Sequence, residues 1–85
     1  MYDIQIELKA KKFLQNIQNP VKSKIVSKIQ SLSENPRPHL CKKLKKSVYY
    51  RIRVSDYRII YKIEDDILKV IVITIGHRKD IYNRI

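Results

Sequence analysis

The sequence YYRIRVSDYRIIYKI, residues 49–63, predicts two β-strands joined by a tight turn at Ser55-Asp56. Because side chains alternate between the two faces of a strand, the first strand has an apolar face and a face that carries two arginines. The apolar face consists of Tyr50, Ile52 and Val54, and the other face consists of Tyr49, Arg51 and Arg53. The second strand runs from Tyr57 to Ile63 and adds Arg58.

A third strand is predicted from Ile67 to Ile75, where almost every residue is apolar, as in a strand covered on both faces. It ends at Gly76, and His77, Arg78 and Lys79 follow directly. Since short turns join the three strands, we expect them to form an antiparallel meander. We predict that they direct arginines, a histidine and tyrosines toward one cationic face.

The N-terminal half of the chain predicts one strand and two helices. Residues 2–8 alternate between apolar and polar types, which is the period of a half-buried strand. Four apolar residues at helical spacing then predict a short helix, and they are Ala10, Phe13, Leu14 and Ile17. Asn19-Pro20 predicts the start of a second helix and Asn35-Pro36 its end. The apolar stripe of this helix consists of Val21, Ile25, Ile29 and Leu32.

Residues 37–47 predict a loop in which Leu40 and Leu44 dock on the protein while four lysines stay exposed. These lysines are Lys42, Lys43, Lys45 and Lys46. The resulting order is strand, helix, helix and three strands, which is an α+β protein with a helical hairpin lying on one sheet. We expect the first strand to lie beside the Ile67–Ile75 strand, and a single domain to span residues 1–85.

The composition favours a folded and strongly basic domain. Its 85 residues include 19 Lys and Arg against 8 Asp and Glu, which gives a net charge of +11, and 44% are hydrophobic. This charge favours nucleic acid, an anionic membrane or an acidic protein as a partner. The longest apolar run is too short to cross a bilayer, and the first residues lack the pattern of a secretory signal. A lone Cys41 predicts no disulfide, no metal site and a reducing cytoplasm.

The basic residues of the three strands predict a phosphate-binding face, because guanidinium groups pair bidentately with phosphate oxygens. They are Arg51, Arg53, Arg58, Arg78 and Lys79, preceded by the four lysines. The interleaved rings of Tyr49, Tyr57, Tyr61 and Tyr82 can stack on unpaired bases. The alternative for each arginine is ordinary solvated surface, and the lysines then add only salt-dependent affinity that is blind to sequence.

His77 is a candidate for proton transfer, since imidazole titrates near neutrality and Arg78 beside it can hold the charge that develops in phosphodiester cleavage. A lone histidine is as often structural. The single glycine excludes a glycine-rich phosphate loop, and neither a Ser-His-Asp set nor paired carboxylates stand out. Any chemistry then uses a nucleophile that the substrate brings, such as an RNA 2′-hydroxyl.

Residues 49–63, the acidic turn at residues 64–66 and the IGHRKDIY of residues 75–82 resemble the RelE branch of the RelE/ParE superfamily of toxins. The element order and the NPRP of residues 35–38 agree, so the resemblance covers nearly the whole chain. It implies a RelE-like fold and the toxin of a type II toxin-antitoxin system. It also implies a ribosome-dependent mRNA endoribonuclease without cofactor, which cleaves in the A site when the RNA 2′-hydroxyl attacks the neighbouring phosphate.

Position by position, the resemblance implies roles for individual residues. Arg58 and Arg78 hold the phosphate and the transition-state charge, Arg51 and Arg53 position the RNA, and His77 or Tyr82 transfers the proton. The implied catalytic residues are Arg53, Arg58, His77, Arg78 and Tyr82. The predicted RNA-binding residues are Lys42, Lys43, Lys45, Lys46, Tyr49, Arg51 and Lys79.

Two departures from the family accompany the resemblance. Some relatives have lysine where Arg51 and Arg53 stand, and the very high pKa of arginine makes it a poor general base. Relatives commonly have glycine where Lys46 and Ser55 stand.

The resemblance also implies partners, which are an acidic RelB-like antitoxin in a resting hetero-oligomer, the ribosome and mRNA, with no role for a membrane. Two alternatives stay open. The ParE branch shares the fold but poisons DNA gyrase, and a non-catalytic, basic RNA-binding module would keep fold and charge alone. The Arg-to-Tyr spacing in GHRKDIY favours the RelE branch.

Overall fold

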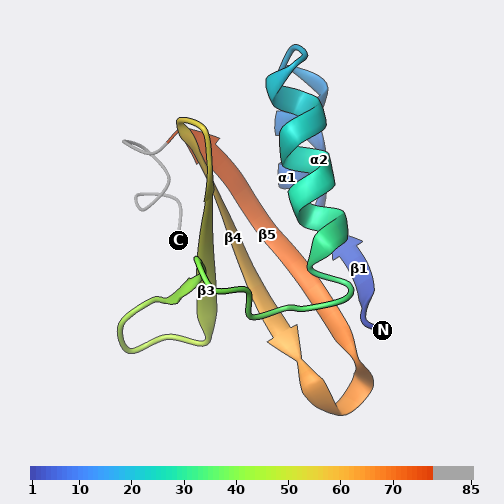
Figure 1. Ribbon diagram of the computed structural model, residues 1–85, viewed down its shortest axis with the longest axis vertical. Helices are drawn as coiled ribbons and strands as arrows, with labels where there is room; N and C mark the ends of the chain where they lie inside the picture. The colour runs from blue at the N-terminus through green and yellow to red at the C-terminus, as the bar shows by residue number, and fades with distance from the viewer. Residues whose placement is uncertain (78–85) are drawn as a thin grey trace.

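The computed structural model describes residues 1–77 of the 85-residue chain (Figure 1). The elements are β1 (Asp3–Ile6), α1 (Leu8–Gln15), α2 (Val21–Ser31), β2 (Lys42–Lys43), β3 (Tyr49–Val54), β4 (Tyr57–Glu64), a 3-10 helix (Asp65–Ile67) and β5 (Lys69–His77). This order confirms the predicted α+β class, with β2 as an addition inside the segment predicted to be a loop. No helix within the described residues has the length and apolar character needed to cross a membrane.

The strands of residues 1–77 form one mixed sheet in the order β1-β5-β4-β3-β2. β3, β4 and β5 are the predicted antiparallel meander. β1 pairs with β5, as predicted, and the pairing is parallel. It is parallel because the helical hairpin returns the chain across the sheet before the meander begins, as parallel strands require.

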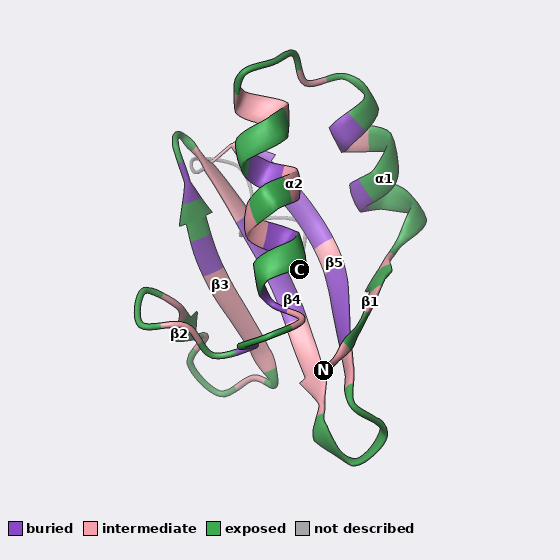
Figure 2. Cartoon of the chain, turned by 45° about the vertical axis from the view of Figure 1, so that its right-hand side comes forward, coloured by how far each residue is buried: buried purple, intermediate pink, exposed green. Residues whose placement is uncertain are grey.

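Both helices lie on the same face of the sheet (Figures 1 and 2), with α1 against β5 and α2 against β3. The apolar stripes predicted for the helices are the ones that face the sheet, since Leu14 of α1 and Ile25 of α2 are buried. The sheet side of this core is formed by Ile52, Val54, Ile59, Tyr61, Val70, Val72 and Ile75. We call this side of the sheet the helix face.

The starts of two predicted elements and the docking of one loop residue are wrong. α1 begins at Leu8, which was assigned to the first strand and is exposed. β5 begins at Lys69, so Ile67 and Leu68 belong to an exposed turn. Leu40, which we expected to dock, is 73% exposed. Apolar character alone cannot locate such ends, because hydrogen bonds to residues far away in sequence decide where the turn forms.

A hydrogen-bond network that includes the exposed turn connects four parts of the chain. Arg37, which follows α2, makes a two-pronged ion pair with Asp65, with Nη1–Oδ1 at 3.2 Å and Nη2–Oδ2 at 2.8 Å. The Tyr2 hydroxyl donates to the same carboxylate at 2.6 Å, and Arg37 Nε donates to the Tyr50 hydroxyl at 3.1 Å. Sequence patterns cannot reveal this network, because Tyr2 and Asp65 are 63 positions apart.

The network predicts a loss of stability in acid. The hydrogen bonds from Arg37 and then Tyr2 lower the pKa of Asp65 from 3.8 to about 2. Since the pKa of Asp65 in the folded state lies below its pKa in the unfolded state, its contribution to stability is complete above the unfolded pKa and is lost as the pH falls through the folded one. We expect Asp65→Asn to lower the melting temperature slightly at pH 7, because the pair is exposed, and by much less at pH 2. Thermal unfolding at both pH values measures this.

Asp66→Asn is the matched control, since Asp66 is the neighbouring exposed carboxylate. An Asp65→Asn deficit of the same size at both pH values would contradict the assignment.

Three non-glycine residues have a left-handed backbone, namely Lys46 (φ 54°), Ser55 (φ 55°) and Leu68 (φ 50°). A side chain with a Cβ costs about 1–2 kcal/mol in this conformation. Lys46 and Ser55 are the two positions at which the resembling family commonly has glycine. The departures from the family therefore fall where the backbone itself favours glycine.

We expect Ser55→Gly to raise the free energy of unfolding by about 0.5–1 kcal/mol, because the relief of backbone strain exceeds the entropy that glycine adds to the unfolded chain. Urea denaturation measures the change. Asp56→Gly in the same turn is the control, since Asp56 has no positive φ and should gain nothing. Equal gains in both variants would show that the turn is not strained at Ser55.

Candidate nucleic-acid interface

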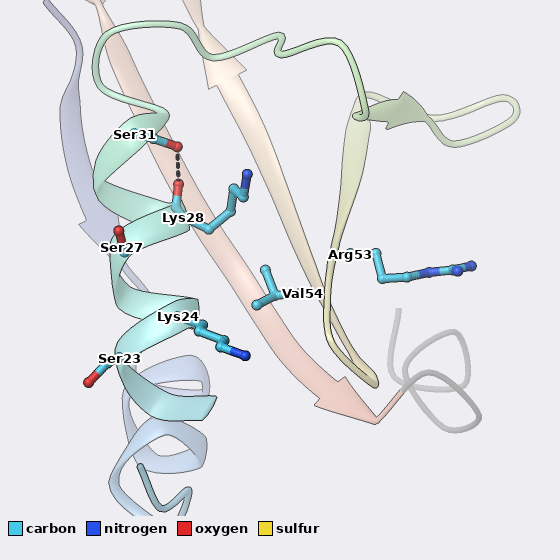
Figure 3. Close-up of a pocket in the computed structure, with 7 residues that line it drawn as sticks. All are labelled: Ser23, Lys24, Ser27, Lys28, Ser31, Arg53 and Val54. Atoms are coloured by element: carbon cyan, nitrogen blue, oxygen red, sulfur yellow. Dashed lines mark hydrogen bonds between the residues drawn. The ribbon is translucent and has the colours of Figure 1, made fainter. Parts of the chain in front are cut away.

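The arginines of β3 and β4 lie together on the sheet face opposite the helices. Arg53 of β3 stands directly across from Arg58 of β4, and Arg51 stands across from Ile60. Residues paired in this way share a face, and Arg51 and Arg53 share it because they are two positions apart. Figure 3 shows the consequence at the edge of the sheet, where Val54 points toward α2 and Arg53 projects away from it. We call this surface the arginine face, defined by Arg51, Arg53 and Arg58.

Arg58 has a particular setting on this face. It is half-buried, and its other neighbour across the sheet is Gly76 of β5, which has no side chain to cover it. Two positions along, Ile60 is paired with Thr74, and both are buried on this side. The Thr74 hydroxyl has no hydrogen-bond partner within the described part of the chain. The result is a buried floor of Ile60 and Thr74 beside a partly buried guanidinium group.

Arg53 and Arg58 stand directly across from each other, so two guanidinium groups share one small area of this face. Arg53 is exposed and Arg58 is half-buried, so a phosphate bound between them would contact one exposed and one partly screened guanidinium group.

The predicted lysines are exposed, as expected, but they do not all share the arginine face. Lys42 of β2 pairs with Arg51 and therefore extends the arginine face. Lys43 pairs with Tyr50 and belongs to the other face. Lys45 and Lys46 lie in the exposed connection between β2 and β3. Tyr49, half-buried, stands across from Lys62 on the arginine face.

The structure places His77 away from the arginine face, contrary to the expectation of one common surface. In β5, Gly76 pairs with Arg58, whereas His77 pairs with Tyr57. The His77 ring packs edge-on against the Tyr57 ring, with 5.9 Å between centroids, and Tyr57 packs in turn against Phe13 of α1 at 5.8 Å. His77 points to the helix face because it directly follows Gly76, and adjacent residues of a strand point to opposite faces. Arg78, Lys79 and Tyr82 lie outside the described residues.

Tyr57 and Tyr61, which we listed among rings able to stack on bases, also belong to the helix face. Tyr61 is fully buried, and its hydroxyl donates to the Pro36 carbonyl at 2.8 Å. Burial raises the pKa of this hydroxyl. Tyr61 is therefore a core residue, and the interpretation as a base-stacking ring is wrong for it.

Two hollows flank the arginine-bearing strand. One, of about 570 Å³, lies between α2 and the end of β3 and is lined by three serines and two lysines of α2 with Arg53 and Val54 (Figure 3). The other, of about 370 Å³, lies at the corner of β2 and β3 and is lined by Leu40, Lys42, Arg51, Arg53 and Ser55. Sequence analysis missed Leu40 and Ser55 as lining residues, because one resembled a docking residue and the other a turn residue.

No group of three or more His, Cys, Asp or Glu side chains gathers as a metal site among residues 1–77. The charged groups that the described residues bring to the arginine face are the guanidinium groups of Arg51, Arg53 and Arg58 and the ammonium group of Lys42. Such groups bind phosphate oxygens and stabilise negative charge, but they do not take up a proton at neutral pH.

A helical hairpin on one sheet face and a row of arginines on the other define a small, basic α+β protein with one cationic sheet face. Residues 4–82 match the model of the family described as the ParE toxin of the type II toxin-antitoxin system parDE. The chain belongs to this family and, with it, to the RelE/ParE superfamily of toxins.

Solved structures of toxin-antitoxin complexes have the same fold. The archaeal RelE-RelB complex from Pyrococcus horikoshii aligns with a TM-score of 0.82 at 23% identity, over 91% of this chain and 94% of that one. The intact E. coli RelBE complex aligns with a TM-score of 0.79 at 25% identity, over 91% of this chain and 96% of that one. The RelB-RelE complex from Methanococcus jannaschii aligns with a TM-score of 0.75 at 27% identity, over 94% of this chain and 96% of that one. A comparison with curated proteins returned no match.

Proposed function

We propose that this toxin is a ribosome-dependent endoribonuclease that cuts mRNA in the A site. The observation that carries the proposal is the Arg53–Arg58 pair, in which two like charges stand directly across the sheet beside the side-chain-free Gly76. A scissile phosphate placed there would meet two guanidinium groups, and its developing charge would be stabilised where the site is partly screened from water. The substrate supplies the nucleophile, so no cofactor is needed.

In the proposed reaction the 2′-oxygen forms a bond to the adjacent phosphorus as the bond to the 5′-oxygen of the next nucleotide breaks. The 2′-hydroxyl loses its proton to a base, and the departing 5′-oxygen takes up a proton. The products are a 2′,3′-cyclic phosphate and a 5′-hydroxyl. Arg58, with Arg78, holds the charge on the non-bridging oxygens, and Arg51 and Arg53 position the strand.

The proton acceptor is the least constrained part of the proposal. The resemblance offers His77 or Tyr82, and Tyr82 lies outside the described residues. His77 packs on Tyr57, toward the helix face, while the phosphate site is across the sheet at Arg58. This geometry gives His77 no direct approach to the proposed phosphate, so in this structure it supports a packing role for His77 better than proton transfer.

The proposed partners follow from charge and from the family. Structural neighbours of the chain are complexes with RelB-type antitoxins. A net charge of +11 favours an acidic antitoxin that covers the cationic surface in a resting hetero-oligomer, and it favours ribosome-bound message as the target of the released toxin. Both partners place the protein in the cytoplasm.

A second candidate function is the poisoning of DNA gyrase, because the family model that matches residues 4–82 is that of the ParE toxin. A third, RNA binding without cleavage, needs only the cationic face. The three candidate functions differ in whether message is cut and whether DNA is broken. A reconstituted translation system tests the first difference, and an assay with gyrase and DNA tests the second. We expect the wild-type protein to cut translated messages inside codons, and to leave them intact when ribosomes are omitted.

The same preparation tested with gyrase and supercoiled DNA should produce no DNA breaks. Gyrase-dependent breaks together with intact message would instead establish the ParE activity. Binding to RNA with neither effect would leave the non-catalytic module.

A further inference from the structure

The hollow at the corner of β2 and β3 combines cationic and apolar surface. Among the described residues that line it, Lys42, Arg51 and Arg53 are cationic, Leu40 is apolar and Ser55 is polar and uncharged. Its volume of about 370 Å³ is in the range of small-ligand sites. It adjoins the proposed phosphate site, because Arg53 lines the hollow and also stands across from Arg58.

The cations of the hollow repeat the arrangement of the phosphate site. Lys42 stands directly across from Arg51, just as Arg53 stands across from Arg58. Arg51 and Arg53 are two positions apart on one strand, which separates the two cationic pairs by about 6.6–6.8 Å. Two like-charged pairs side by side on one face fit two successive phosphates of an extended single strand.

Leu40 lies outside the core formed by the described residues. It is 73% exposed and belongs neither to that core nor to the described residues packed against it. A leucine at the wall of a cationic hollow offers an apolar plate against which the face of an unpaired base can pack, as apolar side chains do in other nucleic-acid sites. The hollow therefore offers contacts for both parts of a nucleotide.

We propose that this hollow is a subsite for the nucleotide next to the scissile phosphate, with Lys42 and Arg51 on its phosphate and Leu40 against its base. The inference rests on the proposed RNA-cleaving function and adds to it a residue that contacts a base. It predicts that part of the affinity for single-stranded RNA comes from contact between Leu40 and a base, and is lost when that base is absent.

The test measures binding of a fluorescein-labelled hexauridylate and of the matching abasic hexamer by fluorescence anisotropy at low salt. We expect wild type to prefer hexauridylate, and Leu40→Ser to weaken hexauridylate binding about fivefold, near the lower limit for base stacking on a side chain. Leu40→Ser should leave abasic binding unchanged. Lys42→Gln should weaken both oligomers equally, because it removes a phosphate contact.

Leu68→Ser is the matched control, an equally conservative change at an exposed leucine in the turn before β5. It should change neither affinity. Equal weakening of both oligomers by Leu40→Ser, no weakening at all, or no measurable binding of hexauridylate by wild type would each overturn the subsite. Failure of the proposed function is a separate result, since wild type would then leave translated message uncut whatever Leu40 does.

Discussion

Replacing Arg58 with alanine should slow message cleavage about 100- to 1000-fold, the usual loss when one group that stabilises transition-state charge is removed. Arg58 is the half-buried member of the arginine pair, and its neighbour on β5 is Gly76, so no side chain of β5 at that position can replace it. Single-turnover cleavage of a message paused on ribosomes measures the change. Arg58→Lys should recover only part of the rate, because an ammonium group cannot bind phosphate bidentately.

Lys11→Ala is the control for net charge, since Lys11 is exposed on α1, which lies against the helix face of the sheet. It should cleave at nearly the wild-type rate. Circular dichroism must show that Arg58→Ala is folded, which we expect because the side chain lies on the arginine face and not in the core between sheet and helices. A folded Arg58→Ala protein that cleaves as fast as Lys11→Ala would show that the chemistry lies elsewhere.

Replacing Ile59 with alanine should lower the free energy of unfolding by about 2–5 kcal/mol, as other large-to-small core substitutions do. Ile59 is fully buried, and it lies next to Arg58 on the central strand β4 with its side chain on the helix face. Because small domains are stable by only about 5–15 kcal/mol, this single change threatens the whole fold. Urea denaturation of the purified protein measures it.

The matched control is Ile67→Ala, in which the same atoms are removed from a side chain that is 59% exposed. Such substitutions at the surface usually change the free energy of unfolding by no more than about 0.5 kcal/mol. If the two variants lost the same stability, Ile59 would not be part of the core that supports the arginine face.

Arg58 and Ile59, neighbours on β4, show why much of the fold could be predicted from sequence. Arg58 and Ile59 point to opposite faces because strand geometry requires it, and that alternation alone separated the arginines from the core. The helical stripes followed in the same way from a period near four residues. A pattern with a fixed period shows which side chains share a face of a helix or strand. The helical layer, the sheet and the arginine face could therefore be predicted from the sequence.

What could not be predicted depends on contacts between distant residues. β2 forms because Lys42 and Lys43 meet β3, and a lysine-rich segment gives no strand signal of its own. The turn before β5 is held by Asp65, Arg37 and Tyr2, and only the structure brings these together. His77 was misplaced for a different reason, since we grouped it with Arg78 by sequence proximity and did not apply the alternation that we used for β3.

The backbone gives the family resemblance a physical basis. Lys46 and Ser55 stand where the resemblance leads us to expect glycine, and both have positive φ, the conformation that glycine adopts most easily. The arginine pair on β3 and β4 brings two like charges together on the other face of the sheet. A stable helix face thus supports a charged face that is suited to binding and is not optimised for stability.

Mapping of message 5′ ends after induction in a bacterial host tests whether the arginine face cuts message. Wild type is compared with Arg53→Ala/Arg58→Ala and with Lys11→Ala/Lys12→Ala, two variants of equal net charge and, after adjustment, equal abundance. We predict cuts inside translated codons for wild type and for the lysine variant, and none for the arginine variant. Cuts that persist in the arginine variant, or growth arrest by wild type with intact messages, would contradict the account.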